Sequence, residues 1–203
     1  MRRTMATHPA DGLIYKELFK KTHGISLEER DSAWDAEEIR ALDKVLSMLP
    51  SSFVSRNPNL KAIVKQREYQ GNYAQAPGHG MYQESAGPKA KKDYIVMYDK
   101  AFRDENGQLK LENIAKTLIH ELSHSLDDEK PGPFQNWLAL SGWFQDVDGS
   151  WLPARDTGFL NQYSMGHPKE DFAESFTAYV LDPDRLRIAS PQKFMFMEQF
   201  FRE

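Results

Sequence analysis

Two histidines spaced four apart, His120 and His124, are the residues best suited to chemistry in this 203-residue chain, and Glu121 follows the first of them. On a helix, residues four apart lie on one face about one turn from each other, so both imidazoles can reach a single metal ion. Glu121 can then reach a water molecule on that ion. This H-E-x-x-H pattern pairs two neutral imidazole ligands with a general base, as in zinc-dependent peptide hydrolysis.

The pattern fixes only three positions and also occurs by chance, in a solvated helix that happens to carry these residues. The surrounding sequence favours a metal site, because apolar residues recur every three to four positions around the motif. They are Leu111, Ile114, Ala115, Leu118, Ile119, Leu122 and Leu126. This pattern predicts a largely buried helix, in which two histidines need polar partners that a metal ion supplies.

A third protein ligand must come from elsewhere, because catalytic zinc sites use three and leave one position open. Asp127 is one candidate, but residues 127–129 are more typical of a helix end before a proline. Glu170 is the better candidate, in a predicted helix that begins at Pro168. Glu174 lies one turn further on the same face. The alternative is an ordinary solvated acidic face. In the functional interpretation, Glu170 binds the metal and Glu174 accepts a hydrogen bond from the spare N–H of a ligand histidine.

The two motifs together resemble a known family. Residues 120–128, a tyrosine at 163 and the stretch 170–176 are similar to the catalytic domain of anthrax lethal factor and related secreted zinc peptidases, including the Pro-Pro endopeptidases. The resemblance covers roughly Ile114 to Tyr179.

This resemblance implies a residue-by-residue assignment. His120, His124 and Glu170 would bind zinc, Glu121 would act as the base, and Tyr163, seven residues before Glu170, would stabilise the transition state. From sequence alone a tyrosine is more often a packing residue, so the spacing to Glu170 carries this prediction. The family usually has glycine where this chain has Ser123, a change expected to affect only packing behind the helix. His167 is a second candidate donor, although a surface turn before proline explains it equally well.

Composition limits the other functions. The formal net charge of −4 gives no support to nucleic-acid binding, and no apolar run is long enough to span a membrane. The chain has no cysteine, which excludes disulfides and thiolate ligands. No secretory signal is visible at the start of this sequence. The length predicts a single domain over 1–203, with a helical N-terminal extension at 1–33 and a core at 34–203. The resemblance implies that this domain is a metallopeptidase and that 34–203 is its catalytic core.

Other segments predict the elements that position the motifs. Residues 12–22 predict a short helix, and Asp35 with Glu38 predicts a capping box that starts a second one. Residues 60–67 and 93–99 predict strands. The segment 69–85, which contains His79, predicts either an edge strand for substrate pairing or a mobile flap.

Aromatic residues gather in two further places. Three of the four tryptophans, Trp137, Trp143 and Trp151, lie between the two motif helices. Core packing is the default explanation for them, and the alternative is that they line the substrate cleft beside the zinc and set specificity. The last residues, rich in Phe and Met, predict a helix docked on the core; exposed, they would form a partner-binding patch.

We therefore expect a zincin-like α+β fold, with a small mixed β-sheet packed against an active-site helix and a glutamate-bearing helix. The predicted function is zinc-dependent endopeptidase activity on a peptide or protein substrate, with one Zn²⁺ per chain. The resemblance also implies a secreted or injected toxin or effector. One alternative is a non-catalytic protein-binding module that retains the fold; another is zinc-dependent hydrolysis of a different bond. Glu121 disfavours the binding module, because a structural zinc site is closed and needs no base. No oligomeric state is predicted.

Overall fold

The computed structural model describes residues 9–68, 80–83, 94–129, 131–154 and 158–202. The chain divides into two compact units, Met1–Leu118 and Ile119–Glu203. The single domain expected over 1–203 stays a prediction. In the described part of the chain, no helix combines the length and the apolar character needed to cross a membrane.

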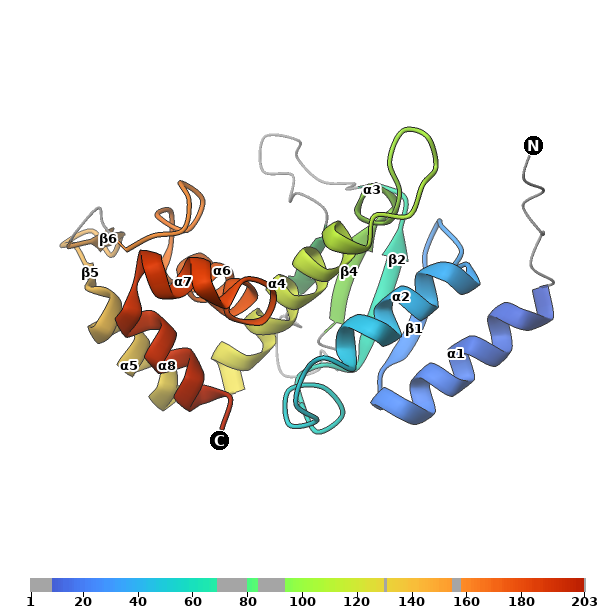
Figure 1. The fold of residues 1–203 in the computed structure, drawn as a ribbon, viewed down its shortest axis with the longest axis horizontal. Helices are drawn as coiled ribbons and strands as arrows, with labels where there is room; N and C mark the ends of the chain where they lie inside the picture. Colours follow the sequence, from blue (N-terminus) through green and yellow to red (C-terminus); the bar gives the residue numbers. More distant parts are fainter. Residues whose placement is uncertain (1–8, 69–79, 84–93, 130, 155–157, 203) are drawn as a thin grey trace. The chain divides into compact units, whose positions relative to one another are not determined.

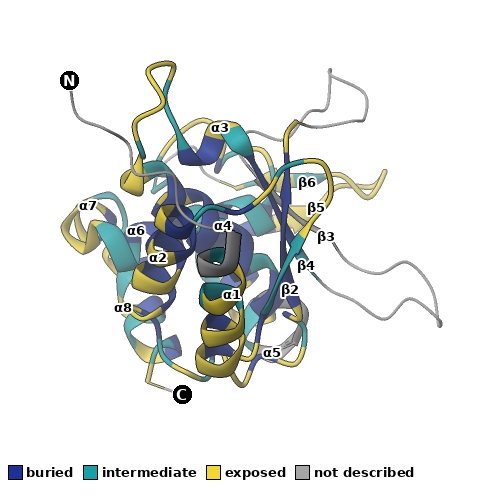
Figure 2. Cartoon of the chain, turned by 90° about the vertical axis from the view of Figure 1, so that its right-hand side faces the viewer, coloured by how far each residue is buried: buried dark blue, intermediate teal, exposed yellow. Residues whose placement is uncertain are grey.

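The first unit contains a four-stranded mixed sheet (Figure 1). Its order is β1 (Ser26–Glu29), β2 (Ala62–Gln66), β4 (Tyr94–Tyr98) and β3 (Gly80–Gln83). The first three strands are parallel and β3 runs antiparallel to β4. All five residues of β2 are buried, as expected for a central parallel strand covered on both faces (Figure 2). The two predicted strands are confirmed, whereas β1 was missed because its Ser-Leu-Glu-Glu sequence lacks β-branched residues.

Strand β3 lies in the segment 69–85, which was predicted to be either an edge strand or a mobile flap. Among the described strands, Gly80–Gln83 pair with β4 alone and lie at one end of the sheet order. Residues 69–79, with His79, and residues 84 and 85 lie outside the described part of the chain. An edge strand is therefore present at 80–83.

In the described part of the chain, two helices precede β2. Local interactions explain where the first helix ends and where the second begins. Helix α1 (Pro9–His23) ends where Gly24 adopts a φ of 73°, and the Gly24 N–H donates to a carbonyl of the last turn. Helix α2 (Ala36–Leu46) begins with the predicted capping box: the Asp35 carboxylate accepts from the Glu38 N–H at 2.9 Å, and Glu38 accepts from the Asp35 N–H at 3.1 Å. The short helix α3 (Asp99–Phe102) follows β4 directly.

Helix α4 (Leu111–Glu129) carries the H-E-x-x-H motif. The predicted apolar stripe is buried from Ile114 to Leu126, as expected for a helix inside the protein. Leu111 is the exception, because it stands exposed in the first turn. Asp127 continues the helix, but its side chain lies outside the described residues.

The rest of the second unit is mostly helical (Figure 1). Its elements are α5 (Pro131–Ser141), β5 (Trp143–Gln145), β6 (Trp151–Pro153), α6 (Pro168–Leu181), α7 (Pro183–Ala189) and α8 (Pro191–Phe200). Strands β5 and β6 form an antiparallel hairpin.

Aromatic side chains make the core of this unit. The Trp137 ring meets Phe172 of α6 edge to face at 5.4 Å, and Phe172 meets Phe200 of α8 at 5.6 Å. Trp137 and Trp143 are buried, so packing is their role. The predicted docking of the C-terminal helix is confirmed by its buried residues, although Met195 remains exposed. The α+β class with a small mixed sheet is likewise confirmed.

Candidate metal centre

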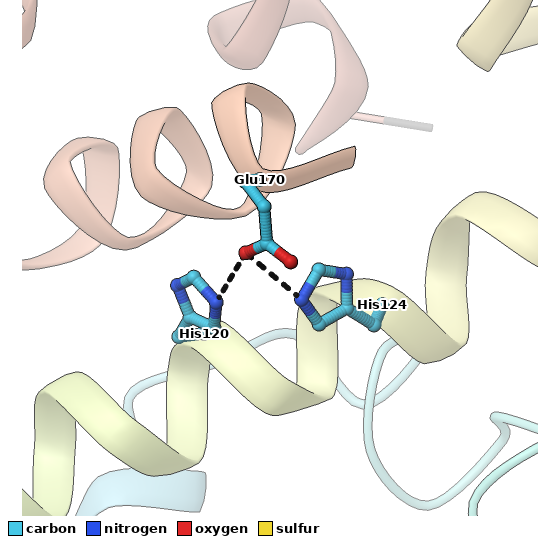
Figure 3. A group of neighbouring side chains, drawn as sticks. All are labelled: His120, His124 and Glu170. Atoms are coloured by element: carbon cyan, nitrogen blue, oxygen red, sulfur yellow. Dashed lines mark hydrogen bonds and ion pairs between the residues drawn. The ribbon is translucent and has the colours of Figure 1, made fainter. Parts of the chain in front are cut away.

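The two motif histidines project from one face of α4, as their spacing predicts (Figure 3). The ring centroids of His120 and His124 lie 5.0 Å apart, with their planes close to perpendicular. Their side chains are only 12% and 15% exposed, so each imidazole reaches the site from a largely buried position.

Glu170 faces both histidines from the first turn of α6 (Figure 3). His167 caps this helix by accepting the Lys169 N–H at its Nδ1 atom, and Pro168 fixes the first helical position. One Glu170 oxygen, Oε2, lies 3.1 Å from Nε2 of His120 and 3.6 Å from Nε2 of His124. Among the described residues, His120, His124 and Glu170 form the one group whose ligand atoms are close enough to share an ion, all within 4.8 Å of one another.

The donor set fits zinc. Bonds of 2.0–2.2 Å to nitrogen and oxygen place neighbouring ligand atoms of a tetrahedral site about 3.3 Å apart. The two distances from Glu170 to the histidines lie on either side of this value. Among the described residues the group offers three protein ligands, the number that catalytic zinc sites use.

Charge around the ligands favours a cation. Burial lowers the pKa of His120, but hydrogen bonds to Glu170 and Glu174 outweigh it and raise the pKa to about 10. Burial would raise the pKa of Glu170, yet its bonds to the two histidines hold that pKa far below its usual range. The carboxylates therefore attract positive charge to this point, and a metal ion would take the place of the His120 proton.

Glu174 contacts the ring nitrogen of His120 that does not face Glu170. Its Oε1 atom lies 3.0 Å from Nδ1 of His120, while Nε2 of the same ring faces Glu170. Both ring nitrogens of His120 therefore face a carboxylate, and its Nε2 atom shares the Glu170 oxygen with Nε2 of His124. The structure thus places Glu174 beside His120, and its orienting role stays a prediction.

Glu121 and Tyr163 lie close to this group. Glu121 is buried, and its charge raises the pKa of both His120 and Tyr163. The Tyr163 ring is 5.9 Å from the His120 ring, and its hydroxyl hydrogen-bonds to Glu170. Partial burial and the nearby Glu170 carboxylate raise the Tyr163 pKa above its ordinary value, so the phenol keeps its proton at neutral pH. Tyr163 is 59% exposed, which separates it from packing residues.

A buried ion pair fixes the helix that carries Glu170. Asp171, the next residue, is 1% exposed and accepts two hydrogen bonds from the Lys193 ammonium at 2.6 and 2.8 Å. The Trp143 indole N–H donates to the same carboxylate at 3.1 Å. No local sequence pattern predicts this pair, because the partners lie 22 residues apart on α6 and α8.

Three other residues near the site form hydrogen bonds that hold the surrounding structure. Ser123 is buried and its hydroxyl donates to the His120 carbonyl at 2.6 Å, so the helix satisfies the polar atom that replaces glycine. His167, the second candidate donor, is the N-cap of α6, with the Trp151 ring 6.5 Å away. Asn161, which no motif in the sequence singled out, donates to the second oxygen of Glu174 at 2.6 Å.

The comparison with protein families agrees with this geometry. The family described as "Putative zinc-binding metallo-peptidase" matches residues 70–187, more than half of the chain and a span that includes both motifs. The chain belongs to this metallopeptidase family. The expected kinship with zinc metallopeptidases is confirmed.

Solved structures show the same fold. The Pro-Pro endopeptidase PPEP-2 from Paenibacillus alvei matches with a TM-score of 0.51 and 16% identity, over 86% of this chain and 97% of that one. At this identity the likeness concerns the fold, and it supports the predicted metallopeptidase architecture. No curated protein matches the chain.

Proposed function

We propose that the chain is a zinc-dependent endopeptidase that hydrolyses peptide bonds, with one zinc ion held by His120, His124 and Glu170. The observation that carries this proposal is the pair of distances, 3.1 and 3.6 Å, from one Glu170 oxygen to the two Nε2 atoms, which fit the spacing of neighbouring ligands in a tetrahedral zinc site. Membership of the metallopeptidase family supports it. PPEP-2 is described as an endopeptidase, and its Pro-Pro preference belongs to that protein.

The reaction would use groups that this chain supplies around the open position. Zinc, when bound, supplies Lewis-acid activation of a water molecule and of the scissile carbonyl. Glu121 accepts the proton of the attacking water and passes it to the leaving amine. The Tyr163 phenol donates a hydrogen bond to the oxyanion that forms on the carbonyl. Glu174 keeps the His120 ring in the tautomer that leaves Nε2 free to bind.

The first test is zinc content, measured on the purified protein beside His124→Ala and Glu170→Ala. We expect about one zinc per wild-type chain and a large loss in both variants. Glu112→Ala is the matched control, because this carboxylate is exposed on the same helix as the histidines. Wild-type protein that takes up no zinc would contradict the proposal and leave the binding module as the better interpretation.

The second test is hydrolysis of a peptide library by the zinc-loaded protein, with a chelator and with zinc added back. Cleavage that stops on chelation and returns with zinc is the expected result. Zinc binding without any peptide cleavage would instead favour hydrolysis of another bond. The role as a secreted or injected effector stays a prediction.

A further inference from the structure

Tyr163 lies in a tight turn that Asn161 and Ser164 close. The Asn161 side-chain oxygen accepts the Ser164 N–H at 2.8 Å, and the Ser164 hydroxyl donates to the Asn161 carbonyl at 2.7 Å. The Gly166 N–H donates to the Tyr163 carbonyl at 3.1 Å. The Ser164 side chain is fully buried, so the turn is anchored in the second unit. These bonds fix the backbone on both sides of Tyr163.

The same asparagine ties this turn to the metal centre. While its oxygen accepts from Ser164, its side-chain nitrogen donates to Oε2 of Glu174 at 2.6 Å. The other Glu174 oxygen faces Nδ1 of His120 at 3.0 Å. One carboxylate therefore joins a metal ligand and the turn that presents Tyr163.

Two other bonds hold the start of this segment, but neither reaches the metal centre. The Lys193 ammonium donates to the Gly158 carbonyl at 2.9 Å, and the Arg185 guanidinium donates to the Leu160 carbonyl at 3.0 Å. Both secure the backbone three residues or more before Tyr163. The Tyr163 hydroxyl is held by its hydrogen bond to Glu170, and the turn that carries Tyr163 is tied to the metal centre by the bond between Asn161 and Glu174.

We propose that Asn161 is a positioning residue for Tyr163: its amide holds the turn against Glu174, so that the phenol stands beside the metal-binding face of His120. This inference rests on the proposed function, in which Tyr163 donates to the oxyanion. The amide suits the place, because one of its atoms donates to a carboxylate while the other accepts a backbone N–H.

The test is a double-mutant cycle with Asn161→Ala and Tyr163→Phe, measured as kcat for a peptide that the wild-type protein cleaves. Losing a hydrogen bond to a charged group at a partly exposed site should lower kcat about 3- to 30-fold in Asn161→Ala. In the Tyr163→Phe background the same substitution should cause almost no further loss, because the hydroxyl that it positions is already gone. If the two reductions in kcat multiply in the double variant, as they do for independent residues, the proposal is overturned.

Asn161→Asp is the sharper variant. It keeps the shape and the acceptor for the Ser164 N–H, but it cannot donate and places a second carboxylate against Glu174. We expect its kcat to fall at least as far as that of Asn161→Ala. Gln162→Ala is the matched control, an exposed amide one position along the same turn, and its kcat should stay within about twofold of wild type. An Asn161→Asp protein with wild-type kcat would overturn the proposal.

Zinc affinity and a fluorine probe provide readouts that do not need turnover. Zinc affinity in Asn161→Ala should stay within about threefold of wild type, because Glu174 still faces His120; a larger fall would mean that Asn161 acts through the metal ligand instead. In protein labelled with 3-fluorotyrosine, the Tyr163 resonance, assigned by its absence in Tyr163→Phe, should move when zinc is added. That shift should shrink in Asn161→Ala, and an unchanged shift would contradict the proposal even if the protein cleaves no peptide.

Discussion

Glu174 and Glu170 hold opposite nitrogens of the same imidazole, since Oε1 of Glu174 lies 3.0 Å from Nδ1 of His120 and Oε2 of Glu170 lies 3.1 Å from its Nε2. Both carboxylates come from one face of α6, one turn apart. A single helix thus supplies a metal-ligand candidate and the group that orients another. The position of α6 therefore sets both carboxylate contacts of His120.

The orienting role of Glu174 gives the first prediction. Glu174→Gln can still accept from Nδ1 but loses the negative charge that increases the basicity of the ring. Zinc affinity should fall about 10- to 100-fold, measured by competition with a fluorescent chelator. Glu198→Gln, an exposed change on α8, is the control and should leave the affinity unchanged. Wild-type affinity in Glu174→Gln would remove Glu174 from the metal centre.

Glu121 gives the second prediction, which separates catalysis from metal binding. Glu121→Gln removes the proton acceptor while keeping the size of the side chain, so kcat should fall by about 10²- to 10⁴-fold. Zinc content should remain as in the wild type, because no ligand changes. Peptide cleavage assays and metal analysis on the same sample make the comparison. An active Glu121→Gln protein would refute the assigned base.

The ion pair beneath Glu170 gives the third prediction. Lys193→Met leaves the Asp171 carboxylate buried without its cation, and breaking one side of such a pair costs about 3–5 kcal/mol. The thermal unfolding midpoint should therefore fall by many degrees. The double variant Asp171→Asn, Lys193→Met should recover part of the loss, since no charge is then left buried. Lys116→Met is the control, because its pair with Glu112 is exposed and should contribute little.

Much of the candidate site follows from local spacing, which the sequence carries directly. The four-residue interval of His120 and His124 and the same interval of Glu170 and Glu174 each define one helix face, and both faces are found as expected. The capping box at Asp35 is equally local. Contacts between elements distant in the chain were not predictable in this way. Asp171 with Lys193, and Asn161 with Glu174, depend on how α6, α8 and the preceding turn pack, which no short pattern encodes.

Strand β1 shows a second limit. Its four residues, Ser26–Glu29, carry two glutamates and no β-branched side chain, so propensity disfavours a strand. Pairing with β2 decides the outcome, with Leu27 opposite Ile63 in a parallel register. Tertiary pairing here overrides the local preference.

The capping box at the start of α2 gives the last prediction, a dependence of stability on pH. Burial alone would raise the pKa of Asp35, but hydrogen bonds from the Glu38 backbone and from Arg103 outweigh it and lower that pKa below 3.8. A carboxyl whose pKa is lower in the folded state stabilises the protein above its unfolded pKa, and this stability is lost as the pH falls through the folded value. The contribution of Asp35 should therefore be complete at pH 5 and decline below about pH 4.

Asn is also a good N-cap and carries no titrating group, so Asp35→Asn isolates this effect. We expect the midpoint of thermal unfolding to fall more steeply in the wild type than in Asp35→Asn between about pH 4 and pH 3, while the two differ by a constant amount from about pH 5 to pH 7. Circular dichroism melts at matched ionic strength provide the measurement. Parallel acid profiles for the two proteins would show that the Asp35 carboxylate does not contribute to stability through its charge.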